Sequence, residues 1–341
     1  MQLSSQTSAA VDIAKAASVA PRGSADRPAK AQLGVNRSQL VAFIVMVACI
    51  IMSPSVIYQT FVMKMMCYAL FACAFNLVLG YVGLLSFGHA AFFGTGCYVG
   101  AWTAKTLGVG PEASLCLGGA AGAALGLAFG YIAIKRQGLY FAMITLALAQ
   151  MTYFFFLQAP FTHGEDGIQQ IPRGRLFGLV SLESDGAMYW FVAVVFLGGL
   201  LFIHRTVHSP FGQVLRGIRE NEERAISLGY ASTSYKLIAF TLSAGLAAVA
   251  GAMKALVFSL ATLNEVSMDT SSLVLLMALL GGLGTMFGPV VGAMLVVVIE
   301  SELAALGSWV TIIQGLVFIG CVLTFKNGIV GEINRRFDIR L

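Results

Sequence analysis

Five polar side chains stand out because they fall within or beside long apolar stretches of the chain. They are Asn76, Ser86, His89, Thr145 and Gln150. In a bilayer such groups either line a pathway for a polar solute or form hydrogen bonds between helices. The residues alone leave both roles open for Asn76 and Gln150. For His89 a hydrogen bond to a neighbouring carbonyl is favoured over a place on a pathway.

Three potential metal ligands occur together in the sequence THGEDGI at 162–168. His163, Glu165 and Asp166 stand almost side by side between glycines, and no further His or Cys cluster supports them, so the spacing is poor for a metal site. A turn shaped by Asp and Gly in an external loop is the better interpretation. An intramembrane enzyme would need a nucleophile with a base, or a metal cluster, and His89 alone supplies neither. We therefore expect no metal site and no catalytic residue.

Nucleotide chemistry is also missing from the sequence. No GxxxxGK[ST] phosphate loop occurs, so the chain is not expected to bind and hydrolyse ATP by itself. Six cysteines lie in apolar runs without CxxC spacing, which is typical of small buried side chains rather than of a disulfide or metal framework. We expect no cofactor in this chain.

The elements that carry these residues are apolar and long. Charged residues make up 11% of the chain and hydrophobic residues 58%, which excludes a soluble fold. The predicted fold is all-α, a polytopic membrane protein with about ten transmembrane or half-spanning helices. The segment around Gly284 is the least regular, and 266–306 is either two full spans or a re-entrant pair. The predicted spans are 39–58, 61–82, 87–107, 112–134, 138–158, 187–204, 236–262, 266–283, 289–306 and 308–325.

The basic residues predict the orientation in the membrane. With ten spans, 16 of the 21 Lys and Arg fall on one side, as expected for cytoplasmic segments. The prediction is a disordered cytoplasmic tail at 1–38, a permease domain at 39–326 and a cytoplasmic tail at 327–341. Within the domain, 159–186 is external and 205–236 is cytoplasmic. The net charge of +5 follows this arrangement, so it does not indicate nucleic-acid binding.

Glycine marks two further features. Gly118, Gly122, Gly126 and Gly130 recur every four positions along one span, which predicts close helix packing. Two glycine-rich turns, GYVGLLSFG ending at 88 and GGLGTMFG ending at 288, interrupt apolar sequence 200 positions apart. They suggest two weakly related halves, an arrangement common in transporters.

The segment 209–236 is the longest charged stretch between two apolar regions. Ser209 and Pro210 predict a helix start, and Gly229 predicts its end. Apolar residues recur with helical spacing at 211, 214, 215 and 218, while charges occupy the other faces. The pattern leaves two roles open: a solvated link between spans, or a surface that receives force from a partner.

Several blocks together resemble a known family. They are GYVGLLSFGHAAFFGTGCYVGA (80–101), GLYFAMITLALAQM (138–151), THGEDGIQQIP (162–172), SPFGQVLRGIRENEERAISLGY (209–230) and LLMALLGGLGTMFGPVVGA (275–293). They resemble the branched-chain amino acid permease family of ABC importers, specifically its M-type subunit, over about 70–330.

The resemblance implies a subunit of a larger machine in the bacterial inner membrane, with both termini cytoplasmic. Its partners would be a sister H-type permease, two cytoplasmic ABC ATPases that hold ATP and Mg, and a periplasmic substrate-binding protein. Glu223-Arg224-Ala225 followed by Gly229 is similar to the EAA-x-x-x-G signature of importer permeases, with Arg in place of the usual second Ala. The implied ATPase-coupling residues are Phe211, Arg216, Arg219, Glu220, Glu223, Arg224, Ala225 and Gly229.

The resemblance also assigns roles to the other polar residues. The pathway candidates are the five polar residues named first, and the binding protein would dock at Thr162, Glu165 and Asp166. The implied cargo is leucine, isoleucine and valine, with urea, short amides or aromatic compounds as alternatives. A self-sufficient secondary transporter or channel is a different reading, but the middles of the spans hold few acidic residues for an ion relay.

Overall fold

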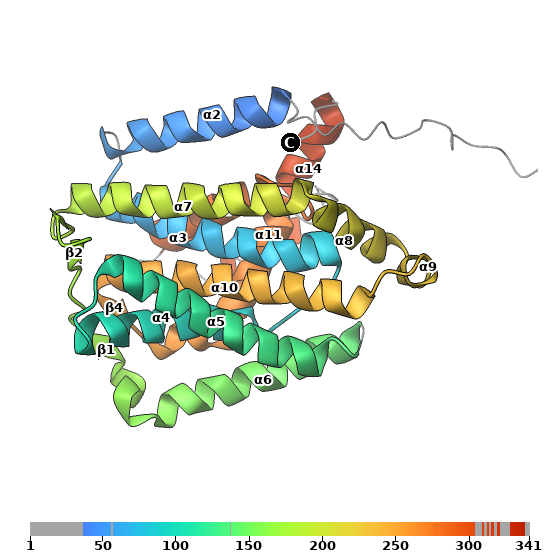
Figure 1. Cartoon of the computed structure of the whole chain (residues 1–341). Coiled ribbons are helices and arrows are strands. Elements are labelled where there is room, and N and C mark those ends of the chain that lie inside the picture. The colour runs from blue at the N-terminus through green and yellow to red at the C-terminus, as the bar shows by residue number, and fades with distance from the viewer. Residues whose placement is uncertain are drawn as a thin grey trace, which may run out of the picture. The chain divides into compact units, whose positions relative to one another are not determined.

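The computed structural model describes residues 37–337, apart from 56, 137, 304–308, 310–311, 314, 317–318 and 321–327. Within these residues the fold is all-α, as predicted (Figure 1). The α-helices are α2 (Arg37–Met52), α3 (Gln59–Asn76), α4 (His89–Thr106), α5 (Pro111–Ala133), α6 (Leu139–Gln158), α7 (Asp185–His208), α8 (Pro210–Glu220), α9 (Glu222–Ser227), α10 (Ser232–Phe258), α11 (Met268–Gly281), α12 (Gly288–Glu302) and α14 (Gly328–Phe337).

Each of the first nine predicted spans contains one of these helices, and most of the tenth, 308–325, lies outside the described residues. Five helices in the described part are long and apolar enough to cross a membrane. They are α3 with its extension to Val82, α5, α6, α7 and α10. Together with the composition, these helices identify a multi-pass membrane protein. Large apolar side chains remain exposed on α5, α6 and α7, as expected for lipid-facing surfaces: Tyr131, Ile132, Met143, Phe154, Phe155, Trp190 and Val194.

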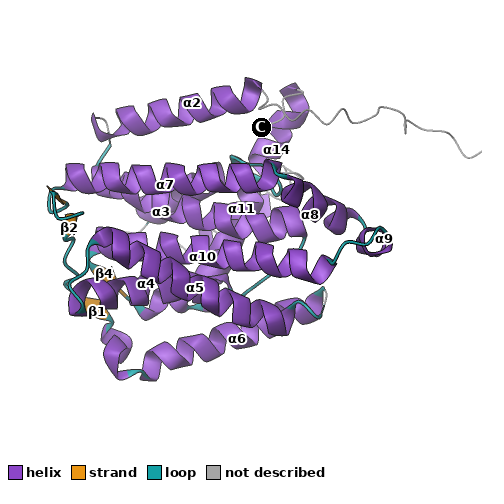
Figure 2. Ribbon diagram, in the orientation of Figure 1, coloured by secondary structure: helices purple, strands orange, loops and turns teal. Residues whose placement is uncertain are grey.

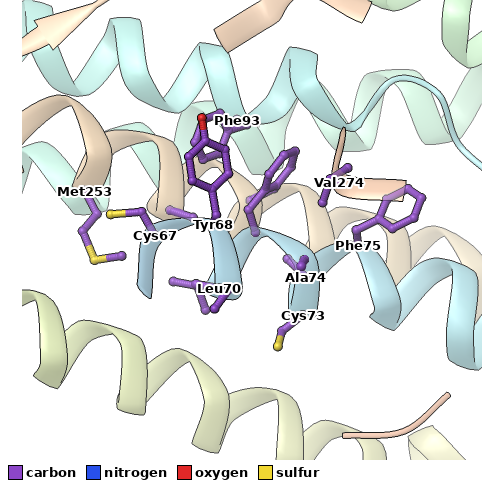
Figure 3. Packing of buried hydrophobic residues seen from close by; sticks show 14 of the residues in the cluster. Cys67, Tyr68, Leu70, Cys73, Ala74, Phe75, Phe93, Met253 and Val274 are labelled. Carbon is purple, nitrogen blue, oxygen red and sulfur yellow. The ribbon is translucent and has the colours of Figure 1, made fainter. Parts of the chain in front are cut away.

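The core is built around α3, which is almost entirely buried and packs against α7, α10, α11 and α12. Its side chains meet Phe93 of α4, Met253 of α10 and Val274 of α11 (Figure 3). Phe71 stacks on Phe93 with ring centroids 4.4 Å apart. At Asn76 the helix widens into one π-helical turn, η2 (Leu77–Val82), which ends at Gly83 in the left-handed conformation. Such turns often occur at functional sites.

Small residues set the distance between α4, α5 and α10. The glycine stripe of α5 packs along α10, with Gly118 facing Ala252, Gly122 facing Ala248 and Gly126 facing Ala244. The close packing predicted from the stripe is therefore confirmed. From α4, Gly100 approaches Ala252 as well, so three helices meet at one methyl group.

The region around Gly284 forms a short hairpin, with α11 and α12 packed on each other and on α3. A helix of 14 residues is about 21 Å long, which is less than the roughly 30 Å hydrocarbon core. These lengths favour the half-spanning alternative for this pair. Helix α14, in the segment predicted as a tail, packs against α11 and α12, and Gly328 lies against Gly282.

The connecting loops form two ends of the bundle. Short strands pair at one end, β1 (Ile168–Gln169) with β4 (Leu260–Ala261) and β2 (Arg175–Leu176) with β3 (Val180–Ser181). A 3₁₀ turn, η4 (Gly164–Asp166), precedes β1, and another, η5 (Leu263–Val266), follows β4. Helices α8 and α9 lie at the opposite end (Figure 2). The predicted external and cytoplasmic loops thus lie at opposite ends of the helices.

Candidate functional site

The charged segment 209–236 contains two short helices before α10. The Ser209 side chain accepts a hydrogen bond from Gly212 N, and Pro210 opens α8, as the sequence predicts. The prediction of one helix up to Gly229 is wrong, because the backbone is extended at Asn221. The Asn221 side chain accepts a hydrogen bond from Arg224 N at 2.9 Å and so caps a second helix, α9. Gly229 has φ +89° and ends this helix.

The apolar face of α8 packs on the protein's own bundle. Leu215 and Ile218 are buried, and Phe211 stacks on Tyr235 of α10 with centroids 5.6 Å apart. In this conformation most of that face is covered, so it is not the surface offered to a partner that the helical spacing suggested. Instead it attaches α8 firmly to the start of α10.

Two exposed arginines of α8 also contact the bundle. The Arg219 guanidinium donates a hydrogen bond to the Gly80 carbonyl, and Arg216 lies over the Tyr81 ring at 5.3 Å from its centroid. A Cβ added at Gly284 would lie 3.3 Å from Arg219 Nη1. The Arg219 side chain therefore ends between two turns that are 200 residues apart in sequence.

Asn76 joins the same two turns from the other side. Its Nδ2 donates to Thr285 O at 2.9 Å, and its Oδ1 accepts from Gly284 N at 3.1 Å. A Cβ at Gly80 would lie 2.7 Å from Gly284 N, so only glycine permits this approach. The two glycine-rich turns noticed in the sequence are thus in direct contact, and Asn76 holds them together.

Helix α9 carries the exposed part of the segment, and in Figure 1 it lies at the tip of the α8–α9 unit. Leu228 is 71% exposed and Ile226 55%, and Tyr230 beside them is also exposed. Charges accompany these apolar groups, since Glu220, Glu223 and Arg224 are exposed, whereas Ala225 is buried. Sequence reasoning missed these three apolar residues because they come after the stretch of helically spaced apolar residues in α8, on which the prediction was based. An exposed apolar patch with a charged rim is typical of a protein interface.

One ion pair fixes α9 to α10. The buried Lys236 ammonium lies 2.6 Å from the Glu222 carboxylate. Neither residue was among the predicted coupling residues, although their opposite charges in one short segment are visible in the sequence.

The predicted pathway residues are mostly buried at helix junctions. Ser86 Oγ accepts from Gly88 N at 3.2 Å, and Thr145 Oγ1 accepts from Phe87 N at 3.3 Å, so both support the start of α4. Gln150 is half-buried on α6.

His89 bonds to a hydroxyl group rather than to a carbonyl. Its Nε2 lies 3.0 Å from Ser243 Oγ, and that hydroxyl donates to Ala74 O, so Nε2 must carry the proton. The ring is enclosed by Phe75, Phe92 and Phe240. In this conformation His89 therefore connects α3, α4 and α10.

The three predicted docking residues differ in exposure. Glu165 and Asp166 are exposed on η4. Thr162 is fully buried, and its hydroxyl donates to the carbonyls of Phe156 and Ala159, both at 2.6 Å. Its role in this structure is to close the end of α6. Among the described residues, no group of three or more His, Cys, Asp or Glu is placed to hold a metal ion.

Comparisons with known proteins find relatives of this chain by sequence. The high-affinity branched-chain amino acid transport system permease protein LivM of Salmonella typhimurium is 30% identical over 256 residues, which cover 68% of this chain and 60% of that protein. The Escherichia coli protein of the same name is 29% identical with the same coverage. A probable branched-chain amino acid transport permease protein LivM of Methanocaldococcus jannaschii is 29% identical over 140 residues, 39% of each chain.

The aligned part is thus less than two thirds of the two bacterial relatives. No solved structure shows a significant match. A family model described as branched-chain amino acid transport system / permease component matches residues 57–322. Because this match covers well over half of the 341 residues, the chain belongs to the branched-chain amino acid transport system permease family.

Proposed function

We propose that this chain is a permease subunit of an ATP-driven importer that carries leucine, isoleucine and valine across the bacterial inner membrane. The family and the names of its relatives support this cargo. The partners would be a sister permease, two cytoplasmic ATPases and a periplasmic binding protein. Both termini would be cytoplasmic, on the side of α8 and α9.

The contact of Arg219 with the two glycine turns is the observation that carries the proposal. Its guanidinium bonds Gly80 and approaches Gly284, and these turns connect α3 to α4 and α11 to α12. A movement of α8 would therefore act on two helix pairs at once. A simple solvated link between α7 and α10 needs no such contact.

In this mechanism α9 is the part that meets an ATPase. Ile226, Leu228 and Tyr230 would enter a cleft of that subunit, and Glu223 and Arg224 would contact its rim. The Glu222–Lys236 ion pair keeps α9 attached to α10, so closure of the ATPases would move α8, α9 and the start of α10 together. ATP would favour one conformation by binding it more tightly than the other.

The external end would receive the loaded binding protein. Glu165 and Asp166 are exposed there, beside the paired strands β1 and β4. Arg173 stiffens this loop, since it bonds Asp185 at 2.7 Å and Val257 O at 3.1 Å. A rigid loop loses little conformational entropy when a partner docks.

Two variants of the reconstituted complex separate attachment from transmission. Leu228→Asp is expected to prevent copurification of the ATPases, because it puts a charge into an apolar contact. Leu179→Asp is the matched control, since Leu179 is 88% exposed at the other end. Arg219→Gln is expected to keep the ATPases bound but to lower leucine uptake per ATP hydrolysed by at least about tenfold, the equivalent of one charged hydrogen bond. Arg205→Gln is its control, an exposed arginine at the end of α7.

The proposal fails if Leu228→Asp keeps its ATPases or if Arg219→Gln transports like the Arg205 variant. If the complex took up urea or aromatic acids but no leucine, the proposed importer role would stand and the proposed cargo would be wrong.

A further inference from the structure

A charged cavity lies at the external end of the bundle, away from the coupling segment. Its volume is about 830 Å³, within the roughly 300–1,000 Å³ of small-molecule sites. It lies between α3, α10, α11 and α12, and five charged side chains of both signs line it: Lys64, Lys254, Glu265, Asp269 and Glu300. Intramembrane charges are costly and usually serve a function.

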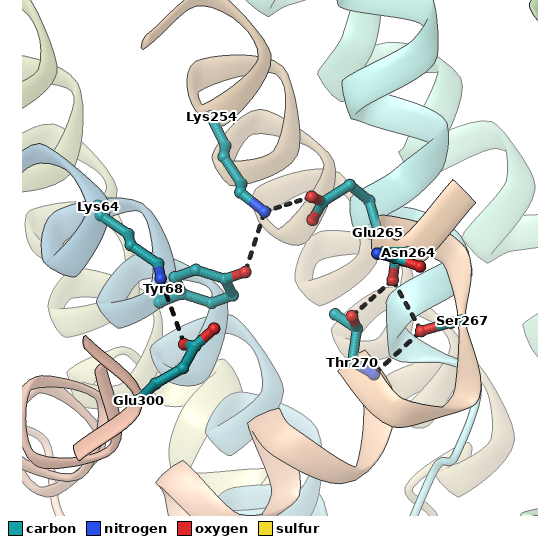
Figure 4. A network of polar contacts seen from close by, with 8 residues as sticks. All are labelled: Lys64, Tyr68, Lys254, Asn264, Glu265, Ser267, Thr270 and Glu300. Atoms are coloured by element: carbon teal, nitrogen blue, oxygen red, sulfur yellow. Dashed lines mark hydrogen bonds and ion pairs between the residues drawn. The ribbon is translucent and has the colours of Figure 1, made fainter. Parts of the chain in front are cut away.

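Two ion pairs hold most of these charges (Figure 4). Lys254 donates to a Glu265 carboxylate oxygen, and also to Tyr68 Oη at 2.9 Å. Lys64 Nζ lies 3.3 Å from Glu300 Oε2. The pairs thus place one ammonium group of α3 and one of α10 on the cavity wall, where a carboxylate could bind.

After the two ion pairs have formed, positively and negatively charged groups of the cavity can still make further hydrogen bonds. The Lys254 ammonium has three N–H donors, and the two hydrogen bonds above use two. Glu265 is only 8% exposed, yet its Oε2 has no hydrogen-bond partner. Asp269 opens α11, is exposed, and has no ion-pair partner among the described residues. A buried carboxylate oxygen without a donor is unfavourable unless a ligand supplies one.

The rest of the wall is apolar. Phe258, Leu273 and Leu276 line the cavity beside the charged groups. A cavity with cationic, anionic and aliphatic parts matches a small zwitterion that carries a branched hydrocarbon chain. It does not match urea, which has no charge and no apolar part.

We propose that this cavity is a binding site for a zwitterionic aliphatic α-amino acid within the permease. The carboxylate binds Lys254, the ammonium binds Asp269 and the free Glu265 oxygen, and the hydrocarbon chain lies against Leu273 and Leu276. This inference rests on the proposed function and adds selection within the permease to that of the binding protein.

The test is equilibrium binding of radiolabelled L-leucine to the purified complete transporter in nanodiscs, without the binding protein. Leucine is expected to bind, and 4-methylpentanoate and 3-methylbutan-1-amine, which each lack one charge, to compete at least about tenfold more weakly. Asp269→Asn is expected to weaken leucine binding by a similar factor. Glu183→Gln, an exposed external carboxylate away from the cavity, should leave it unchanged. Retained ATPase activity shows that each variant is folded.

The outcomes separate this inference from the proposed function. Leucine import by the complete system without leucine binding to the permease overturns the inference alone. Equal competition by the two singly charged analogues, or equal binding by the Asp269 and Glu183 variants, overturns it too. A system that imports urea and no leucine overturns both.

Discussion

Replacing Gly100 by Ala tests the packing of the central helices. A Cβ at this position of α4 would lie 2.8 Å from the Ala252 methyl group of α10. Carbon atoms in contact are about 3.5 Å apart, so the helices would have to separate by about 0.7 Å. Neither partner can rotate away, because a methyl group next to the backbone has no alternative rotamer. The same Ala252 methyl also faces Gly118 of α5, so the displacement would reach a third helix.

The size of the stability change caused by Gly100→Ala depends on the structure that the separated helices keep in the unfolded state. In water Ala would favour a helix over Gly by about 1 kcal/mol. Separated spans remain helical in detergent or lipid, so this preference cancels between the folded and unfolded states. The overpacking term remains, and we expect Gly100→Ala to lower the free energy of unfolding by about 1 to 3 kcal/mol.

Equilibrium unfolding in mixed detergent micelles, followed by tryptophan fluorescence, measures this loss. Gly198→Ala is the matched control, because nothing lies within 4 Å of a Cβ at that position of α7. A second change, Ala252→Gly, removes the clashing methyl group and should recover at least half of the loss in the double variant.

The packing argument is refuted if Gly100→Ala is as stable as Gly198→Ala. It is also refuted if Ala252→Gly recovers none of the loss.

Two further substitutions test other parts of the fold. Gly167→Ala is expected to lower stability by about 1 to 3 kcal/mol, because φ +68° and ψ −173° suit only glycine and a Cβ would strike Ala261 O. Gly178 also has a positive φ, but nothing lies within 4 Å of a Cβ built there. Gly178→Ala should therefore lower the melting temperature less than Gly167→Ala does. Equal decreases would contradict the proposed clash with Ala261 O. Lys236→Met is expected to cost about 1 to 3 kcal/mol, because Glu222 loses its charged partner. Hydrogen exchange of residues 222–227 should then quicken, and unchanged exchange would show that the pair does not hold α9.

Helices and their ends could be predicted from the sequence where a single local property of the residues determines them. Long apolar runs can satisfy their backbone in a membrane only as helices, so nine apolar helices were located from composition, although five of them, among the described residues, are long enough to cross a membrane. The Ser209–Pro210 start and the Gly229 end of the coupling segment follow from capping chemistry. The glycine stripe of α5 predicted close packing because residues without a side chain allow two helix backbones to approach closely.

The site was less predictable because side-chain direction depends on tertiary contacts. Arg219 belongs to a charged, solvent-exposed face, yet its guanidinium bonds a glycine carbonyl 139 positions earlier in the chain, and no local rule predicts that contact. Asn221 looks like any polar residue inside a helix until its side chain competes for the Arg224 amide. The Lys254–Glu265 pair joins α10 to η5, and the spacing of apolar residues in the sequence does not show that these two elements lie close together.

The contact between the two glycine turns also constrains the order of events during synthesis. Asn76 and Thr285 are 209 residues apart. At about 5 to 20 residues per second, ribosomes need roughly 10 to 40 s to make the intervening chain. During that interval α3 is already synthesised, but Asn76 lacks both of the partners that later hold it. The two turns can therefore be joined by Asn76 only after Gly284 and Thr285 have been made, so a chain truncated before Gly284 cannot form this contact.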